Sequence, residues 1–144
     1  MKKIFDASAI MVLIKNHPAE AVEHLKNEHL LDLTIYELGN AIWKINRLLK
    51  KPDKNTALES IKQIQSLTAL MKTHVVQDKH AQLAIMEKAF QYNLTYYDSA
   101  YITAAQHLKY ALVTTDKRLQ KAANTANINT KDIESLLTQN TNTE

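Results

Sequence analysis

Two acidic residues in this chain stand at the ends of short apolar runs that have the composition of buried strands. Ile4-Phe5 leads directly into Asp6, and the run 111–114 leads to Asp116. A helix-like pattern follows each acid, so strands and helices alternate along the chain. Alternation of this kind predicts a mainly parallel sheet joined by right-handed crossovers. We therefore expect a single α/β domain with a central sheet of four to five strands and helices on both faces.

The other elements follow from hydrophobic periodicity and from residues that start or stop helices. We expect further strands at 29–33 and 74–77, and a minor edge strand around Ile128. The predicted helices cover 9–14, 19–26, 34–51, 53–71, 79–92, 98–108, 117–124 and 130–137. The capping residues expected include a Thr34–Glu37 capping box, either Asp53 or Thr56, Asp78 and Thr130. The domain should span residues 1–137, and residues 138–144 should form a polar, disordered tail.

Composition excludes several classes of protein. A single glycine in 144 residues argues against an all-β fold with many tight turns, and the absence of cysteine excludes disulfides, thiolate zinc sites and cysteine nucleophiles. No apolar stretch reaches the ~18 residues that span a bilayer. Asp6, Lys15 and His17 interrupt an N-terminal run that would otherwise resemble a signal peptide. We expect a cytoplasmic protein without membrane contact.

The stretch 34–51 carries two stripes at helical spacing. One is apolar and is expected to pack on the sheet: Ile35, Leu38, Ile42, Ile45 and Leu49. The other begins with an acid and becomes basic: Glu37, Asn40, Lys44, Arg47 and Lys51. Such a polar face could guide a phosphate backbone toward the acid, which agrees with the formal net charge of +3. Trp43 lies off the apolar stripe and is interpreted as a residue that faces a partner subunit.

Four acids are expected at one edge of the sheet. Glu37 lies just past the predicted strand 29–33, and Asp98 begins the helix that leads into the strand at 111–114. Ligands of open α/β sheets bind outside the carboxyl ends of the strands, where Asp6 and Asp116 also lie. Each acid taken singly is more simply a helix cap. Capping, however, gives no reason for the four to converge, and we call them the acidic quartet.

A cluster of carboxylates repels itself, and a hard divalent cation is the usual remedy. Oxygen ligands favour Mg²⁺ or Mn²⁺ over zinc. The six histidines lack paired ligand spacing and are interpreted as surface or packing residues. Ser8 and Thr114 are interpreted as capping or supporting hydroxyls because no histidine base is placed beside them. Tyr101 is interpreted as a core or rim aromatic.

Four segments resemble the PIN-domain ribonucleases, particularly the VapC-like toxins of prokaryotic toxin–antitoxin pairs. They agree in order, spacing and predicted context along nearly the whole chain: IFDASA at 4–9, IYELGN at 35–40, YDSAY at 97–101 and LVTTDKRL at 112–119. The resemblance implies that the acidic quartet, Asp6, Glu37, Asp98 and Asp116, is catalytic and binds Mg²⁺ or Mn²⁺. Ser8, Asn40 and Thr114 are expected to support it.

The resemblance further implies an endoribonuclease that hydrolyses RNA phosphodiester bonds, forms a homodimer and is silenced by a small antitoxin. One alternative is the same fold used as an RNA- or partner-binding module with little catalysis, although four mutually repelling acids would serve no purpose there. Another is a phospho-acceptor receiver or an aspartyl-phosphate hydrolase. The first needs adjacent acids after the first strand and the second needs an Asp two residues beyond the first acid, and Ala7 and Ser8 fit neither.

Overall fold

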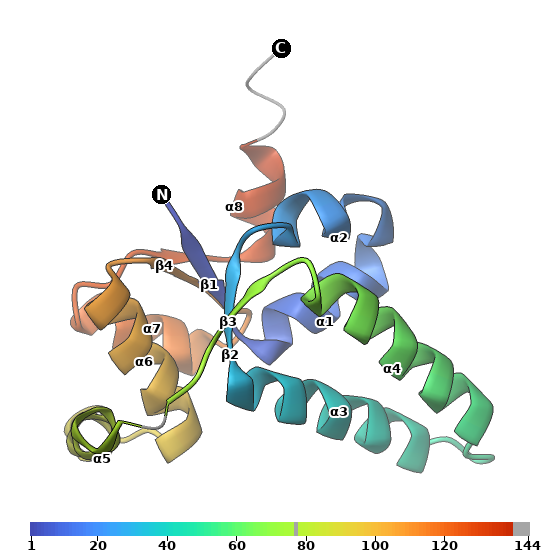
Figure 1. Ribbon diagram of the computed structural model, residues 1–144, viewed down its shortest axis with the longest axis horizontal. Helices are drawn as coiled ribbons and strands as arrows, with labels where there is room; N and C mark the ends of the chain where they lie inside the picture. Colours follow the sequence, from blue (N-terminus) through green and yellow to red (C-terminus); the bar gives the residue numbers. More distant parts are fainter. Residues whose placement is uncertain (77, 140–144) are drawn as a thin grey trace.

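The computed structural model of the chain describes residues 1–76 and 78–139. It shows a parallel sheet between two groups of helices (Figure 1). The strands are β1 (Lys3–Phe5), β2 (His29–Leu31), β3 (Lys72–His74), β4 (Ala111–Val113) and β5 (Thr130–Lys131). Their order is β3-β2-β1-β4-β5, and every pairing is parallel. The predicted parallel α/β sheet is therefore confirmed.

Eight helices connect and cover these strands in the described part of the chain. One side carries α1 (Ala7–Asn16), α2 (Pro18–Leu25), α3 (Asp32–Arg47), α4 (Lys54–Thr68) and α8 (Ile133–Thr138). The other side carries α5 (Lys79–Tyr92), α6 (Tyr96–Leu108) and α7 (Lys117–Thr125). The last helix includes Thr138, the first residue of the predicted tail, and residues 140–144 lie outside the described residues. No described helix is long and apolar enough to cross a membrane.

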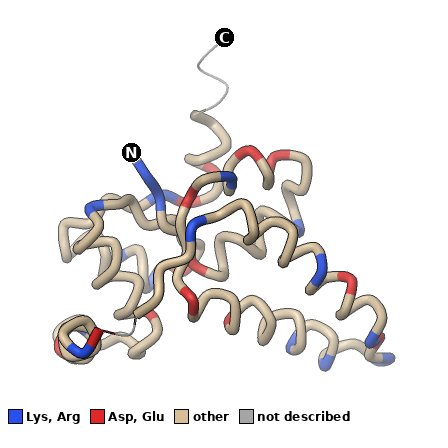
Figure 2. Tube along the Cα trace, viewed as in Figure 1, with Lys and Arg blue, Asp and Glu red and all other residues tan. Residues whose placement is uncertain are grey.

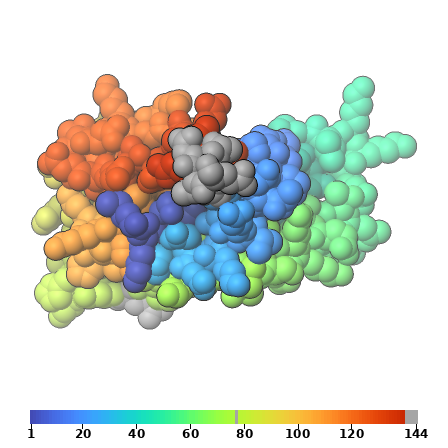
Figure 3. Space-filling view, turned by 90° about the horizontal axis from the view of Figure 1, so that it is seen from above, coloured from blue at the N-terminus to red at the C-terminus, as the bar shows by residue number. Residues whose placement is uncertain are grey.

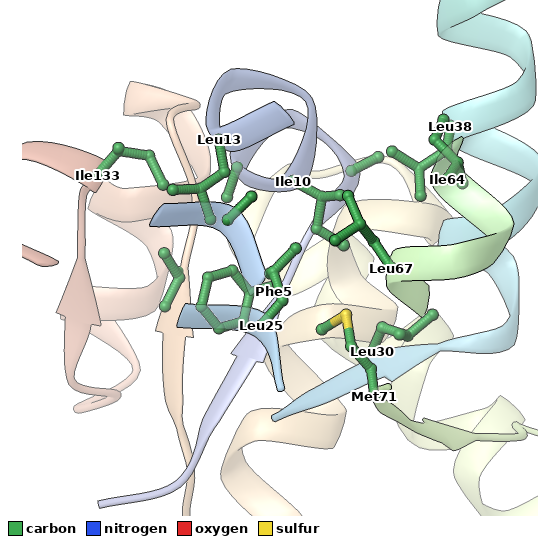
Figure 4. Close-up of a cluster of buried hydrophobic side chains, with 14 of the residues drawn as sticks. Phe5, Ile10, Leu13, Leu25, Leu30, Leu38, Ile64, Leu67, Met71 and Ile133 are labelled. Atoms are coloured by element: carbon green, nitrogen blue, oxygen red, sulfur yellow. The ribbon is translucent and has the colours of Figure 1, made fainter. Parts of the chain in front are cut away.

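Neighbouring residues of each central strand serve two separate cores, because successive side chains in a strand point to opposite faces. Phe5 and Leu30 pack with residues of α1, α2 and α4, as Figure 4 shows. Ile4 and Leu112 pack instead against α5, α6 and α7. A strand buried on both faces has to be apolar throughout. This explains why β1 and β4 are continuous apolar runs in the sequence.

The edge strand β3 begins two residues before its predicted start. It was expected at 74–77, of which Gln77 lies outside the described residues, but it runs from Lys72 to His74. Pairing with β2 determines this position, since the Lys72 N–H donates to the Glu28 carbonyl over 2.8 Å. Lys72 and Thr73 are exposed, and an edge strand therefore lacks the apolar signal of a central one. The other edge strand, expected around Ile128, is also displaced, to Thr130–Lys131.

Helix α3 is shorter and less buried than predicted. It begins at Asp32, directly after β2, and ends at Arg47 rather than at the residue before Pro52. Leu38 and Ile42 are buried, but the other three members of the predicted stripe are 41%, 43% and 47% exposed: Ile35, Ile45 and Leu49. The prediction that the whole stripe packs on the sheet is wrong. The end of α3 and its connection to α4 project at one end of the molecule, beyond the sheet (Figures 1 and 3).

The helix caps are partly as predicted. Asp53 caps α4 and Asp78 caps α5, each accepting hydrogen bonds from main-chain N–H groups of the first turn. The predicted cap at Thr130 is wrong, because Asp132 caps α8 and Thr130 lies in β5. The predicted capping box that starts at Thr34 is also wrong, because that residue is already inside α3. These helices thus begin at the Asp nearest the first turn, in agreement with the strong preference of Asp for this position.

Candidate functional site

The carboxyl ends of β1 and β4 bring Asp6 and Thr114 together. The two strands are neighbours, and the Asp6 N–H donates to the carbonyl of Val113 over 3.1 Å. The Asp6 side chain is only 6% exposed and caps α1. Its Oδ1 accepts from the Ser8 hydroxyl over 2.7 Å and from the Ala9 N–H over 2.9 Å. Its Oδ2 accepts from the Thr114 hydroxyl over 2.5 Å.

The two hydroxyls that hold Asp6 are themselves held by the main chain. Ser8 Oγ accepts from the Thr115 N–H, and Thr114 Oγ1 accepts from the Asp116 N–H, each over 3.1 Å. A main-chain N–H can only donate, so each hydroxyl is left to direct its single hydrogen at the carboxylate. Ser8 and Thr114 thus lie where supporting residues would have to lie, although that role stays a prediction.

Glu37 lies in the second turn of α3 and contacts a tyrosine from α6. Its Oε1 accepts from the Tyr101 hydroxyl over 2.8 Å, and Tyr101 is 1% exposed. The Tyr101 hydroxyl also lies 2.6 Å from Thr34 Oγ1, which accepts from the Leu31 N–H over 3.2 Å. No pattern in the sequence indicates this contact directly. The only available signal was the position of Tyr101 three residues after Asp98, which places both on one face of a helix.

The remaining acids are at helix starts. Asp98 is in the first turn of α6, but it is not the cap, because Thr95 Oγ1 accepts from the Asp98 N–H over 3.1 Å. Asp116 is exposed and caps α7, where its Oδ1 accepts from the Arg118 N–H over 2.9 Å. Capping therefore explains Asp6 and Asp116 but neither Glu37 nor Asp98.

The members of the quartet act on one another electrostatically. Burial is the main cause that raises the pKa of Asp6, Glu37 and Asp98 above the usual carboxyl range. The charge of Asp98 adds to the rise at Asp6 and Glu37, and the charge of Asp116 adds to the rise at Asp98. Arg118 opposes the rise at Asp98. Within residues 1–76 and 78–139, no lysine or arginine forms an ion pair with any of the four.

The donor atoms fit a hard divalent cation, although no ready-made cage is present. No three Asp, Glu or His side chains of the described residues are grouped so that they could hold a metal ion. The quartet nevertheless offers only carboxylate oxygens, which Mg²⁺ and Mn²⁺ prefer, and a cation would relieve its repulsion. Asp6 already uses three of its roughly four acceptor sites, whereas Glu37 accepts one hydrogen bond. Glu37 and Asp98 are thus the freer carboxylates, and the metal site stays a prediction.

A cavity of about 490 Å³ adjoins the quartet between α1 and α3. Ser8 and Glu37 contribute to its lining, together with Asn40 and two lysines, Lys15 and Lys44. Figure 2 shows acidic residues near the start of α3 and basic residues toward its end. A larger cavity, about 710 Å³, lies among β3, α5 and α6, and no member of the quartet lines it. The smaller cavity is therefore the one that joins positive charge to the acids.

Comparison with known sequences identifies the family. The model of the PIN domain matches residues 3–125. The chain is 32% identical over 127 residues to Ribonuclease VapC3 of Pyrobaculum aerophilum, covering 83% of this chain and 92% of the relative. It is 31% identical over 116 residues to Exonuclease VapC9 of the same organism, covering 81% of each.

Comparison with solved structures agrees. PAE2754 from Pyrobaculum aerophilum superposes with a TM-score of 0.78 at 29% identity, covering 96% of this chain and 88% of that one. A toxin–antitoxin complex from Klebsiella pneumoniae shares the fold alone, with a TM-score of 0.60 at 13% identity and coverage of 80% of this chain and 87% of that one. The chain belongs to the PIN-domain family, as a relative of the VapC ribonucleases of toxin–antitoxin systems.

Proposed function

We propose that this protein is a metal-dependent endoribonuclease that hydrolyses RNA phosphodiester bonds and acts as the toxin of a toxin–antitoxin pair. The observation that carries the proposal is the electrostatic coupling of Asp6, directly after β1, with Glu37 of α3 and Asp98 of α6; none of the three forms an ion pair with a lysine or arginine of residues 1–76 and 78–139. Acids coupled in this way suit a site that a bound cation completes. Membership of a nuclease family supports the same assignment.

The acidic quartet would hold Mg²⁺ or Mn²⁺. Bound there, the cation would supply an activated water and stabilise negative charge on the phosphate. The protein's own part is to keep the carboxylates ionised and oriented. Hydrogen bonds to Asp6 from Ser8 and Thr114, and to Glu37 from Tyr101, favour the ionised forms and oppose the effect of burial.

RNA would approach along the cavity between α1 and α3. Lys15 lies in the last turn of α1 and Lys44 in the last turn of α3, and both line this cavity with Glu37. Lysine side chains attract the phosphates of a nucleic-acid backbone whatever the base sequence. Asn40 adds a neutral hydrogen-bonding side chain among them. The two lysines would thus bind the RNA, and the acidic quartet would cleave it.

A protein partner would cover the outer face of α3. Tyr36 and Trp43 on α3, and Leu48 just past its end, are 81%, 58% and 87% exposed, which is costly for large apolar side chains that stay in water. The Klebsiella pneumoniae structure with the same fold is a toxin–antitoxin complex, which supports an antitoxin as partner. A second copy of the chain, expected from the sequence, is the other candidate for this face.

A second candidate activity is exonucleolytic cleavage, since one relative is an exonuclease. Incubation of the protein with circular and linear single-stranded RNA of one sequence separates the two activities. An endonuclease converts the circle to a linear product in Mg²⁺ or Mn²⁺ and not in EDTA, whereas an exonuclease degrades only the linear RNA. Asp98→Asn, purified in parallel, controls for contaminating nucleases. Retention of both substrates by a protein that still binds RNA would overturn the proposal in favour of a binding module.

A further inference from the structure

The hydroxyl of Tyr101 points to a role beyond packing. We infer that Tyr101 is a positioning residue, which holds the Glu37 carboxylate in the orientation that metal binding requires. This inference rests on the proposed function, because it assigns Tyr101 to the same metal site. It concerns a residue that packs in the core and that closes the segment YDSAY at 97–101.

The hydrogen bonds between β2 and Glu37 run in one direction only. The Leu31 N–H must donate to Thr34 Oγ1, and the Glu37 carboxylate can only accept from the Tyr101 hydroxyl. Each hydroxyl has one hydrogen, and that of Tyr101 is used on Glu37. The 2.6 Å contact between the two hydroxyls is therefore donated by Thr34 to Tyr101. The chain of donors leads from the main chain of β2, through two buried hydroxyls, to one oxygen of Glu37.

Glu37 has little else to hold it. Its side chain has three rotatable bonds and is only partly buried, and among the described residues the bond to Tyr101 is the hydrogen bond it makes. The other oxygen, Oε2, is left without a hydrogen-bond partner in the described ranges. Without the phenol the carboxylate would turn toward water, where its charge is better solvated. The phenol thus fixes one oxygen and leaves the second free for a cation.

The same contact links two members of the quartet. Tyr101 follows Asp98 by three positions on α6, so one helical turn carries an acid and the group that orients another acid. The hydrogen bond spans 64 positions in the sequence and joins α6 to α3. A shift of either helix would change the separation of Glu37 from Asp98. Tyr101 therefore acts on the relative placement of both carboxylates.

A plain packing role for Tyr101 is the competing interpretation, and the chain offers variants that separate the two. Its ring belongs to the core beside α5, α6 and α7, and Tyr101→Phe keeps the ring while removing the hydroxyl. Tyr92→Phe is a matched control, because Tyr92 is a partly buried tyrosine packed against the same core, and no hydrogen bond of its hydroxyl is seen among the described residues. Thr34→Val removes the donor behind Tyr101, and Thr34→Ser restores it.

Mn²⁺ binding to the full chain by titration calorimetry, with the melting temperature in EDTA, tests the inference. Tyr101→Phe should weaken Mn²⁺ binding by about tenfold to a hundredfold, the usual effect of removing a partner of a metal ligand. Thr34→Val should weaken it less, and Thr34→Ser and Tyr92→Phe should bind as the wild type does. Excess Mn²⁺ should restore RNA cleavage by Tyr101→Phe, because an orientation defect lowers metal affinity and leaves the ligands in place.

Two results would overturn the inference while leaving the proposed function intact. These are wild-type affinity in Tyr101→Phe, whether or not its melting temperature falls, or an equal loss of affinity in Tyr92→Phe. A wild-type protein that neither binds Mn²⁺ nor cuts RNA would instead contradict the proposed function, and the inference with it.

Discussion

Thr114 donates its hydroxyl to Asp6 over 2.5 Å, although the two residues are 108 positions apart in the sequence. The contact exists because β1 and β4 are adjacent and end at the same edge of the sheet. The same hydroxyl accepts from the main-chain N–H of Asp116. One side chain thus connects two acids of the quartet, and its loss should affect both stability and the site.

Thr114→Val tests this connection. Valine keeps the shape of the side chain but leaves an oxygen of Asp6 without its donor and the Asp116 N–H without its acceptor. We expect the free energy of unfolding to fall by about 1–3 kcal/mol, the usual cost of unpaired buried polar groups. Urea denaturation measures it. Thr103→Val is the control, because the Thr103 hydroxyl donates only to a carbonyl within its own helix, and an equal loss there would contradict the prediction.

Metal should stabilise the protein more at neutral than at acidic pH. Burial raises the pKa of Glu37 and Asp98, so between the ordinary and the raised pKa the folded protein holds protons that the unfolded chain has released. Stability without metal therefore falls as the pH rises through that window. Mg²⁺ competes with these protons and binds the folded state alone, so its stabilisation grows with pH.

Differential scanning fluorimetry with Mg²⁺ or EDTA at pH 5 and pH 7 measures this effect. The rise in melting temperature on adding Mg²⁺ should be larger at pH 7, and Asp98→Asn should show little rise at either pH. A rise of the same size in wild type and Asp98→Asn would mean that the cation binds elsewhere.

The lysines of the cavity should affect RNA binding rather than the cutting step. Lys15→Gln and Lys44→Gln should each weaken binding and reduce the slope of log affinity against log salt by about 0.7, the value for one phosphate contact on single-stranded RNA. Cleavage at saturating RNA should stay close to wild type. Lys109→Gln, at the far end of the Asp98 helix, is the control. An unchanged salt slope in both cavity variants would place the RNA path elsewhere.

A partly buried histidine pair, His29 and His74, should make the protein less stable in mild acid. His29 Nδ1 lies 2.8 Å from His74 Nε2, and desolvation lowers the pKa of both imidazoles. At His29 the neighbouring His74, Lys72 and Lys2 lower it further, whereas Glu28 opposes them. In the folded protein the pair is therefore neutral above the ordinary pKa near 6.5. Its contribution to the free energy of unfolding is complete above that pH and is lost as the pH falls through the lowered pKa values.

The melting temperature of wild type and His29→Phe between pH 7.5 and pH 5 measures this loss. The variant should lose less on acidification, because it lacks one imidazole that must take up a proton. The exposed His107 lies outside the pair, and His107→Gln should follow the wild-type curve. Identical curves for wild type and His29→Phe would rule out the pair as the cause.

Local signals in the sequence were sufficient for much of the fold. Helix α5 lies at Lys79–Tyr92 as predicted, because an Asp cap and a clear stop bound it. Strands β1 and β4 were predictable because both their faces are buried, which makes them apolar throughout. The arrival of Asp6 and Asp116 at one edge followed from the rule that ligands bind at the carboxyl ends of parallel strands.

Features that depend on distant partners could not be predicted. Exposure of Ile35 and Ile45 depends on where α3 leaves the sheet, and a helical stripe looks the same whether the core or a partner covers it. The position of β3 depends on pairing with β2 and not on its own polar residues. Tyr101 was interpreted as an ordinary aromatic, because Glu37, its acceptor, lies 64 positions away.

Parallel titration of wild type and Asp98→Asn with Mn²⁺, followed by an RNA cleavage assay, shows whether the acidic quartet binds the metal on which cleavage depends. Asp98 does not cap α6, and burial and Asp116 disfavour its charge in the folded protein, so the variant should keep its fold with a melting temperature in EDTA equal to or above that of wild type. Wild type should bind Mn²⁺ and cut RNA, and Asp98→Asn should lose most of both. Wild-type binding and cleavage in Asp98→Asn would contradict this prediction.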